Sequence, residues 1–104
     1  MGRTSRPRKV TDYETVFRFA GGTGILREEL WVDESDKAVR YNLAFIAPHL
    51  ARADNGRILG YDNAHGAHER HFMGQAEPAG YEGFPATARR FYREVEAIRR
   101  SYEG

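Results

Sequence analysis

The segment over residues 38–47 constrains the fold most, because its apolar side chains recur with the period of a β-strand. They occupy every second position: Val39, Tyr41, Leu43 and Phe45. Side chains at this spacing lie on the same face of a strand. Pro48 ends the segment, since proline lacks the backbone N–H that a central strand needs. The rest of the chain must therefore supply neighbouring strands and a layer over the apolar face.

Four further segments predict strands, at residues 12–20, 25–32, 58–61 and 69–73. The glycine-rich residues 21–24 predict a hairpin turn between the first two strands, and Asp54, Asn55 and Gly56 predict a turn before the fourth. Residues 74–83 contain one proline and three glycines, and we expect an irregular crossing there.

A C-terminal helix is predicted by apolar residues at alternating spacings of four and three: Phe84, Ala88, Phe91, Val95, Ile98 and Tyr102. Pro85 suits its first turn, and the opposite face carries most of five arginines. The order of the elements predicts an α+β fold, in which one C-terminal helix covers a curved antiparallel meander of about five strands.

The length of 104 residues predicts a single domain, over residues 11–104, preceded by a flexible basic arm over residues 1–10. The absence of cysteine excludes disulfides and thiolate ligands. No apolar run is long enough to span a bilayer or to form a signal peptide, so we expect a cytoplasmic protein with no membrane contact.

The densest polar chemistry lies in residues 57–74, which hold three of the four histidines. One interpretation is acid–base cleavage of a phosphodiester, because histidine titrates near neutral pH. In that scheme Asp62 orients a histidine, His68 or His71 acts as base and acid, and Arg70 stabilises the charged phosphate. We expect this chemistry to need neither a metal ion nor a cofactor.

Two other interpretations remain open. Asp62 with His65, His68 or His71 would make a metal site, if the chain bends at Gly66 to bring the histidines together. Alternatively, the cluster is structural, with Asp62 and Asn63 capping a turn through their side chains. Substrate contacts are expected from a larger set of polar residues near the cluster and on the helix: Tyr61, Asn63, His65, Arg89 and Arg93.

Alternation within the strand over residues 69–73 also limits which residues act together. His71 shares one face with Glu69, whereas His68 and Arg70 share the other with Phe72, so the two pairs cannot serve one site. If Phe72 is in the core, His71 is exposed beside Glu69. If the core holds residue 73 instead, His68 and Arg70 face outward with Asp62, which is the arrangement that we favour.

The motif Gly60-Tyr61-Asp62-Asn63-Ala64-His65, the later His71-Phe72-Met73-Gly74 and the helix that follows together resemble the TumE-like toxin family of bacterial toxin–antitoxin modules. The resemblance covers roughly residues 38–98. It implies a bacterial cytoplasmic toxin whose partner is an antitoxin with a helix-turn-helix domain. The expectation of a metal-independent ribonuclease rests on the residue chemistry alone.

The alternative from another class is a non-catalytic module that binds protein or nucleic acid. Such a module would use an exposed edge of the sheet, or the acidic turn at residues 33–37.

Overall fold

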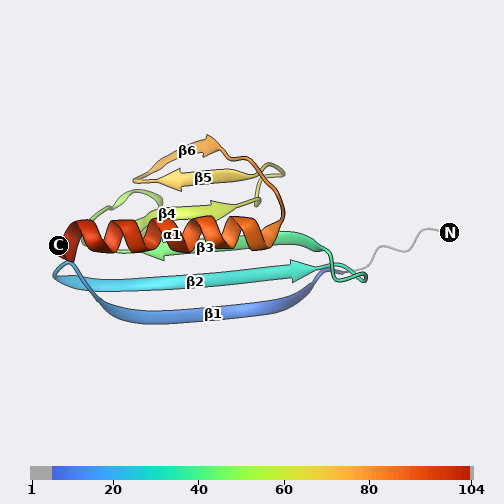
Figure 1. Ribbon diagram of the computed structural model, residues 1–104, viewed down its shortest axis with the longest axis horizontal. Coiled ribbons are helices and arrows are strands. Elements are labelled where there is room, and N and C mark those ends of the chain that lie inside the picture. Colours follow the sequence, from blue (N-terminus) through green and yellow to red (C-terminus); the bar gives the residue numbers. More distant parts are fainter. Residues whose placement is uncertain (1–5, 104) are drawn as a thin grey trace.

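The protein is described by a computed structural model that covers residues 6–103. One antiparallel sheet and one long helix make up the fold (Figure 1). In chain order the elements are β1 (Arg8–Phe19), β2 (Gly22–Val32), β3 (Ala38–Ile46), the short turn η1 (Ala53–Gly56), β4 (Arg57–Asp62), β5 (Glu69–Phe72), β6 (Gln75–Pro78) and α1 (Phe84–Glu103). Each strand lies beside the one that precedes it. The predicted α+β meander with a C-terminal helix is confirmed, and the sheet has six strands.

The additional strand β6 lies in the segment that was expected to be irregular. Met73 and Gly74 form the turn into it, both with positive φ (49° and 87°), and Phe72 pairs with Gln75 on either side. All four residues of β6 are exposed, so no apolar alternation marked it in the sequence. Pairing of its backbone with β5 creates the strand instead.

The first hairpin turns at Ala20 and Gly21, earlier than expected, since Phe19 already pairs with Gly22. The next glycines belong to β2. A Cβ atom on Gly24 would come within 2.9 Å of the Phe17 ring, so this glycine allows the ring to approach the strand. Strand β1 begins at Arg8, so residues 8–10 of the expected arm belong to the sheet, and residues 1–5 lie outside the described part of the chain.

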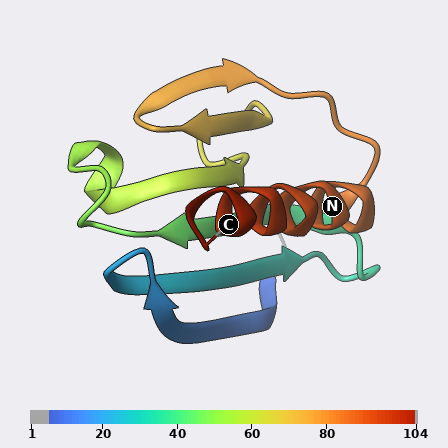
Figure 2. The same cartoon turned by 60° about the vertical axis from the view of Figure 1, so that its left-hand side comes forward.

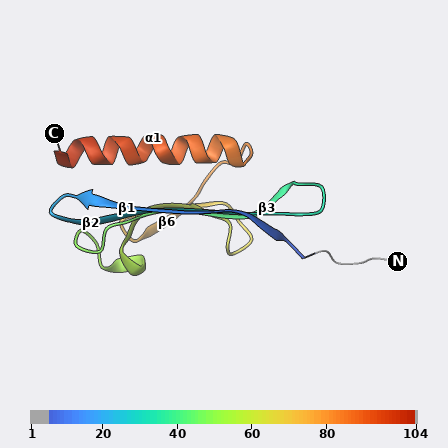
Figure 3. The same ribbon diagram turned by 90° about the horizontal axis from the view of Figure 1, so that it is seen from below.

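Helix α1 covers one face of the sheet, over the middle strands (Figures 2 and 3), and contacts β3 and β4. Phe91 and Val95 are its most buried apolar residues, at 0% and 2% exposure, which agrees with the expected apolar face. The core between the layers contains mostly aromatic and branched side chains, namely Phe19, Tyr41, Leu43, Phe45, Ala47, Ile58, Leu59, Tyr61, Phe91 and Val95. No helix within residues 6–103 has the length and apolar character needed to cross a membrane.

Among residues 6–103, no α-helix lies on the opposite face of the sheet; the η1 turn lies on this side (Figure 3). We call it the open face. Asp54 and Asn55 in η1 have left-handed backbone angles, with φ of 53° and 55°. Aspartate and asparagine tolerate this conformation better than most residues, which explains why the sequence marks a turn here.

Candidate functional site

The sheet separates the predicted catalytic residues into two pairs. Tyr61 pairs with Arg70 and Asp62 with Glu69 across β4 and β5. Because adjacent residues of a strand point to opposite faces, Arg70 lies on the helix side and His71 lies on the open face with Asp62. His68, just before β5, contacts helix-side residues. The four predicted catalytic residues therefore do not form one site.

Neither apolar neighbour of these residues belongs to the core. Phe72 and Met73 are each 41% exposed, since β5 lies beyond the strands that the helix covers (Figure 1). The sequence left open which of these two residues lies in the core, and in the structure neither does.

On the helix side, the carboxylate of Glu94 joins the helix to two strands. Its Oε2 accepts hydrogen bonds from Arg70 Nε at 3.1 Å and from Nη2 at 2.5 Å. Its Oε1 accepts a short hydrogen bond from the Tyr61 hydroxyl. Arg70 also reaches Glu77 in β6, with 3.2 Å between Nη1 and Oε1. A phenol, a carboxylate and a guanidinium thus meet at one point.

These contacts fix the charge state of each group. Burial opposes ionisation of Glu94, but the hydrogen bonds from Arg70 and Tyr61 outweigh it and lower the pKa of Glu94 below its ordinary value of 4.5. Burial, followed by the hydrogen bond to Glu94, raises the pKa of Tyr61 to about 12. The same pairing with Glu94 raises the pKa of Arg70. At neutral pH, Glu94 is a carboxylate and Tyr61 keeps its proton.

A cavity of about 250 Å³ lies beside this group, between α1 and the segment before it. It is lined by Tyr61, Gly80, Glu82, Ala86, Thr87, Arg90 and Arg93. The guanidinium of Arg90 lies 5.2 Å from the centre of the Tyr61 ring, on its face. Of the two predicted helix arginines, Arg93 lines the cavity and Arg89 does not. The exposed guanidinium groups of Arg90 and Arg93 therefore lie near the Tyr61 hydroxyl, which is hydrogen-bonded to Glu94.

His68 has a structural environment instead. Its Nδ1 lies 2.9 Å from the Tyr41 hydroxyl, and its ring stacks on Tyr81 with 3.7 Å between the centroids. Phe84 packs edge-on against Tyr41 at the start of the helix. The imidazole is held within an aromatic stack that joins β3 to the segment before α1.

Asn63 and His65 contact neither Glu94 and its partners nor the ring of His68. Asn63 ties the turn after β4 to β3, because its Oδ1 accepts from Tyr41 N and its Nδ2 donates to Val39 O, each at 3.0 Å. His65 is exposed in the same turn, where Gly66 has a φ of 83°. Asn63 thus joins the turn to β3, whereas Asp62 caps the turn, since its Oδ1 accepts a hydrogen bond from Ala64 N.

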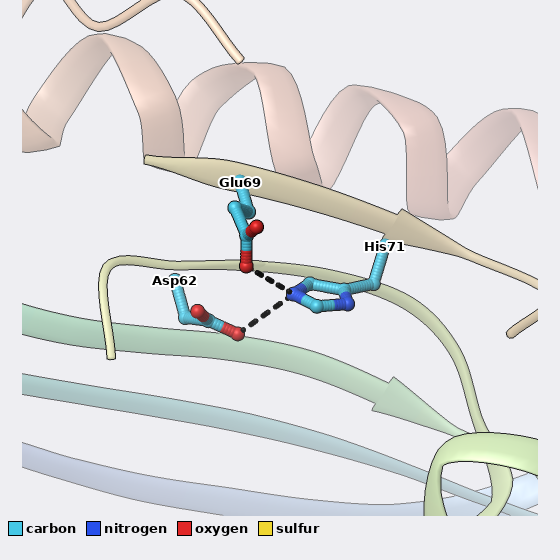
Figure 4. A group of neighbouring side chains, drawn as sticks. All are labelled: Asp62, Glu69 and His71. Carbon is cyan, nitrogen blue, oxygen red and sulfur yellow. Dashed lines mark ion pairs between the residues drawn. The ribbon is translucent and has the colours of Figure 1, made fainter. Parts of the chain in front are cut away.

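On the open face, His71 lies among carboxylates (Figure 4). Its Nε2 is 3.2 Å from Asp62 Oδ2 and 3.6 Å from Glu69 Oε1. Its Nδ1 is 3.9 Å from Asp54 Oδ2. Arg57 bridges two of these carboxylates, with Nη1 at 2.9 Å from Asp62 and Nε at 2.7 Å from Asp54. Asp62, Glu69 and His71 are the residues of the described chain that are placed to hold a metal ion.

The sequence interpretation missed Glu94, Arg90 and Arg57. Glu94 is separated by 24 residues from Arg70 and by 33 from Tyr61, so no local motif joins them. One signal was present: Glu94 directly precedes the core residue Val95 in a helix whose outer face is mostly arginine. An acidic residue beside the apolar face of such a helix is placed to meet a cation on the sheet.

Comparison of the chain with protein-family models, curated proteins and solved structures found no match in any of the three.

Proposed function

We propose that this protein is the toxin of a bacterial toxin–antitoxin module, and that it cleaves RNA without a metal ion at the helix-side cavity. One observation carries the proposal: the Glu94 carboxylate is bonded to the Tyr61 hydroxyl and to Arg70, beside a cavity whose wall holds Arg90 and Arg93. A base, a proton donor and cations for a phosphate are the groups that metal-independent cleavage of RNA requires.

In the proposed reaction, Arg90 and Arg93 bind the scissile phosphate. Glu94 takes the proton of the ribose 2′-hydroxyl, and the 2′-oxygen attacks phosphorus. The bond from phosphorus to the 5′-oxygen breaks, and this oxygen takes the proton of Tyr61. The proton on Glu94 then passes to Tyr61 along the hydrogen bond between them. The products end in a 2′,3′-cyclic phosphate and a 5′-hydroxyl.

The ionisation states support these roles. The lowered pKa of Glu94 keeps its carboxylate ionised at neutral pH, which a proton acceptor requires, and Tyr61 holds a proton to give. Arginine suits the phosphate, because its guanidinium stays charged and presents paired donors. Arg89, exposed on the same helix, would guide RNA towards the cavity.

The assignment as a toxin rests on the resemblance to the TumE-like family. The same resemblance implies that the partner is an antitoxin with a helix-turn-helix domain and that the toxin acts in the cytoplasm. The chemistry of the cavity supports RNA as the substrate, since the 2′-hydroxyl supplies the attacking oxygen.

The test compares growth of a bacterial host after induction with cleavage of RNA by the purified protein. Glu94→Gln and Tyr61→Phe should each relieve growth arrest and lower the cleavage rate by at least about 100-fold, the usual size of an acid–base contribution. Glu96→Gln, an exposed change on the same helix, is the matched control and should behave as the wild type. Cleavage at the wild-type rate by folded Glu94→Gln protein would exclude the mechanism.

A second candidate is the non-catalytic binding module. Strand β1 forms one edge of the sheet and extends over 12 residues, with Val10, Tyr13 and Val16 exposed. A long edge strand can pair with a strand of a partner. Growth arrest that persists in both site variants, without RNA cleavage, would favour this function.

A further inference from the structure

We propose that the open face binds a divalent transition-metal ion through Asp62 Oδ2, Glu69 Oε1 and His71 Nε2. This site goes beyond the RNA cleavage proposed above, and it lies on the other face of the sheet from Glu94. The ion would be Zn²⁺ or Mn²⁺, because one imidazole with two carboxylates combines ligands that suit these metals.

Strand geometry brings the three ligands together. Asp62 is paired with Glu69 across β4 and β5, and His71 follows Glu69 by two residues on the same face. His71 in turn pairs with Gly60, and the Arg57 side chain lies over this glycine, where a Cβ atom would come within 2.6 Å of Arg57 Cδ. The three side chains converge from two strands (Figure 4).

The ligand atoms have the separations that a metal ion requires. All three lie within 4.8 Å of one another, and His71 Nε2 is 3.2 Å from Asp62 Oδ2 and 3.6 Å from Glu69 Oε1. Ligands about 2.1 Å from a tetrahedral zinc ion lie roughly 3.4 Å apart. An ion can therefore enter with little movement of the side chains.

His71 supplies an independent observation. Its Nε2 is buried and has no hydrogen-bond partner among residues 6–103, the one side-chain atom there in this condition. Although Asp62 Oδ2 lies 3.2 Å away, no acceptor of the described chain is aligned with this nitrogen as a hydrogen bond requires, so its bonding capacity remains unused. Nε2 points between the carboxylates of Asp62 and Glu69 (Figure 4), and an imidazole nitrogen beside two carboxylates is a set of ligands that zinc accepts.

The charges around the His71 imidazole also favour binding of a cation. Asp54, Asp62 and Glu69 lie within 3.9 Å of the imidazole, and Arg57 is the cation that bonds to two of them. The three carboxylates carry two more negative charges than Arg57 offsets, and one divalent ion would supply the matching positive charge. Arg57 uses one lone pair of Asp62 Oδ2, and the second remains for the ion.

The surroundings resemble the outer shell of a metal site. Asp54 Oδ2 lies 3.9 Å from His71 Nδ1, so a small approach would let this carboxylate accept the hydrogen bond that usually orients a metal-bound histidine. Asp62 Oδ1 accepts a hydrogen bond from Ala64 N at 3.2 Å, which fixes the orientation of the carboxylate. Three protein ligands leave a position for water or a bound anion.

Isothermal titration of the whole chain with Zn²⁺ or Mn²⁺, near neutral pH, tests the site directly. The wild type should bind one ion per chain, and Zn²⁺ should bind tighter than Mn²⁺. His71→Gln and Glu69→Gln should each weaken binding at least about 10-fold, and Asp54→Asn about 10-fold through the outer shell. His65→Gln and Glu77→Gln, which change an exposed histidine and a carboxylate of the other face, are the matched controls. Binding that is absent from the wild type, or equal in the His71 and control variants, would overturn the proposal.

A second measurement on the wild type does not depend on how the variants fold. In a long-range ¹H–¹⁵N spectrum of the histidine rings, Zn²⁺ should shift the Nε2 resonance of one ring to the position of a metal-bound nitrogen. A shift confined to the exposed His65 ring, or no shift, would contradict the site. Both measurements use resting protein without RNA, so they succeed or fail independently of RNA cleavage.

Discussion

At the scale of single residues, Glu94 has the most consequential position. Its carboxylate accepts hydrogen bonds from Tyr61 in β4 and from Arg70 in β5, while its own backbone belongs to α1. A partly buried carboxylate is tolerated there because two donors, one of them charged, replace the water that it loses. The same pair of bonds that stabilises the helix on the sheet also sets the ionisation of the proposed base.

Glu94 should make the free energy of unfolding depend on pH in the acidic range. Its pKa is lower in the folded than in the unfolded protein, so its ionised form stabilises the fold above pH 4.5, and this contribution is lost as the pH falls through the folded pKa. Glu94→Gln should therefore lower the free energy of unfolding at about pH 7, and much less at about pH 3. Urea unfolding at both values measures the difference.

Glu96→Gln again provides the control for that measurement, since Glu96 is exposed on the same helix. An equal loss for Glu94→Gln at both pH values would show that the amide disturbs packing rather than charge.

At the scale of elements, α1 packs on the sheet through one apolar face, in which Phe91 and Val95 are the most buried residues. Phe91 is fully buried and meets the Tyr61 ring edge-on, with 6.4 Å between the centroids, and also contacts Tyr92. The helix thus positions Glu94 and the cavity arginines through the packing of its other face. Loss of that packing would move the whole site.

Phe91→Ala should lower the free energy of unfolding by about 3–5 kcal/mol, because a cavity replaces a buried ring. Arg100→Ala, an exposed change on the same helix, should stay within about 0.5 kcal/mol of the wild type. Chemical unfolding followed by circular dichroism gives both values. A loss of under 1 kcal/mol for Phe91→Ala, by the same scale, would mean that the helix contributes little to the fold.

At the scale of the whole molecule, the sheet separates the helix-side cavity from the cluster of carboxylates around His71. The helix side carries the cavity with its arginines, and the open face carries the carboxylates around His71. A net charge of only +1 conceals this division. RNA should therefore bind the helix side, where cations line the cavity.

This division predicts how RNA binding depends on salt. In the inactive Glu94→Gln background, Arg90→Ala and Arg93→Ala should each reduce the slope of log Kd against log salt concentration by roughly 0.7 for one lost phosphate contact. Arg18→Ala, exposed on β1 and remote from the cavity, should leave the slope unchanged. Equal slopes for all variants, measured by fluorescence anisotropy, would place RNA elsewhere.

Much of the fold could be predicted because its signals are local. The alternation at Tyr41, Leu43 and Phe45 reports one buried strand face, and the spacing from Phe84 to Ile98 reports one buried helix face. Strand β6 left no such signal, because its side chains are exposed and its pairing uses the backbone. Less of the candidate site could be predicted, since residues close in sequence, such as Arg70 and His71, point to opposite faces.

The sequence by itself determined the elements other than β6, their order and the strand alternation that separates Arg70 from His71. These features follow from local spacing and from the conformational preferences of single residues. Only the tertiary structure decided which side the helix covers. That choice brought Glu94 to Tyr61 and Arg70, and left Asp62, Glu69 and His71 together on the open face. Contacts between residues distant along the chain depend on how whole faces pack, which no short stretch of sequence encodes.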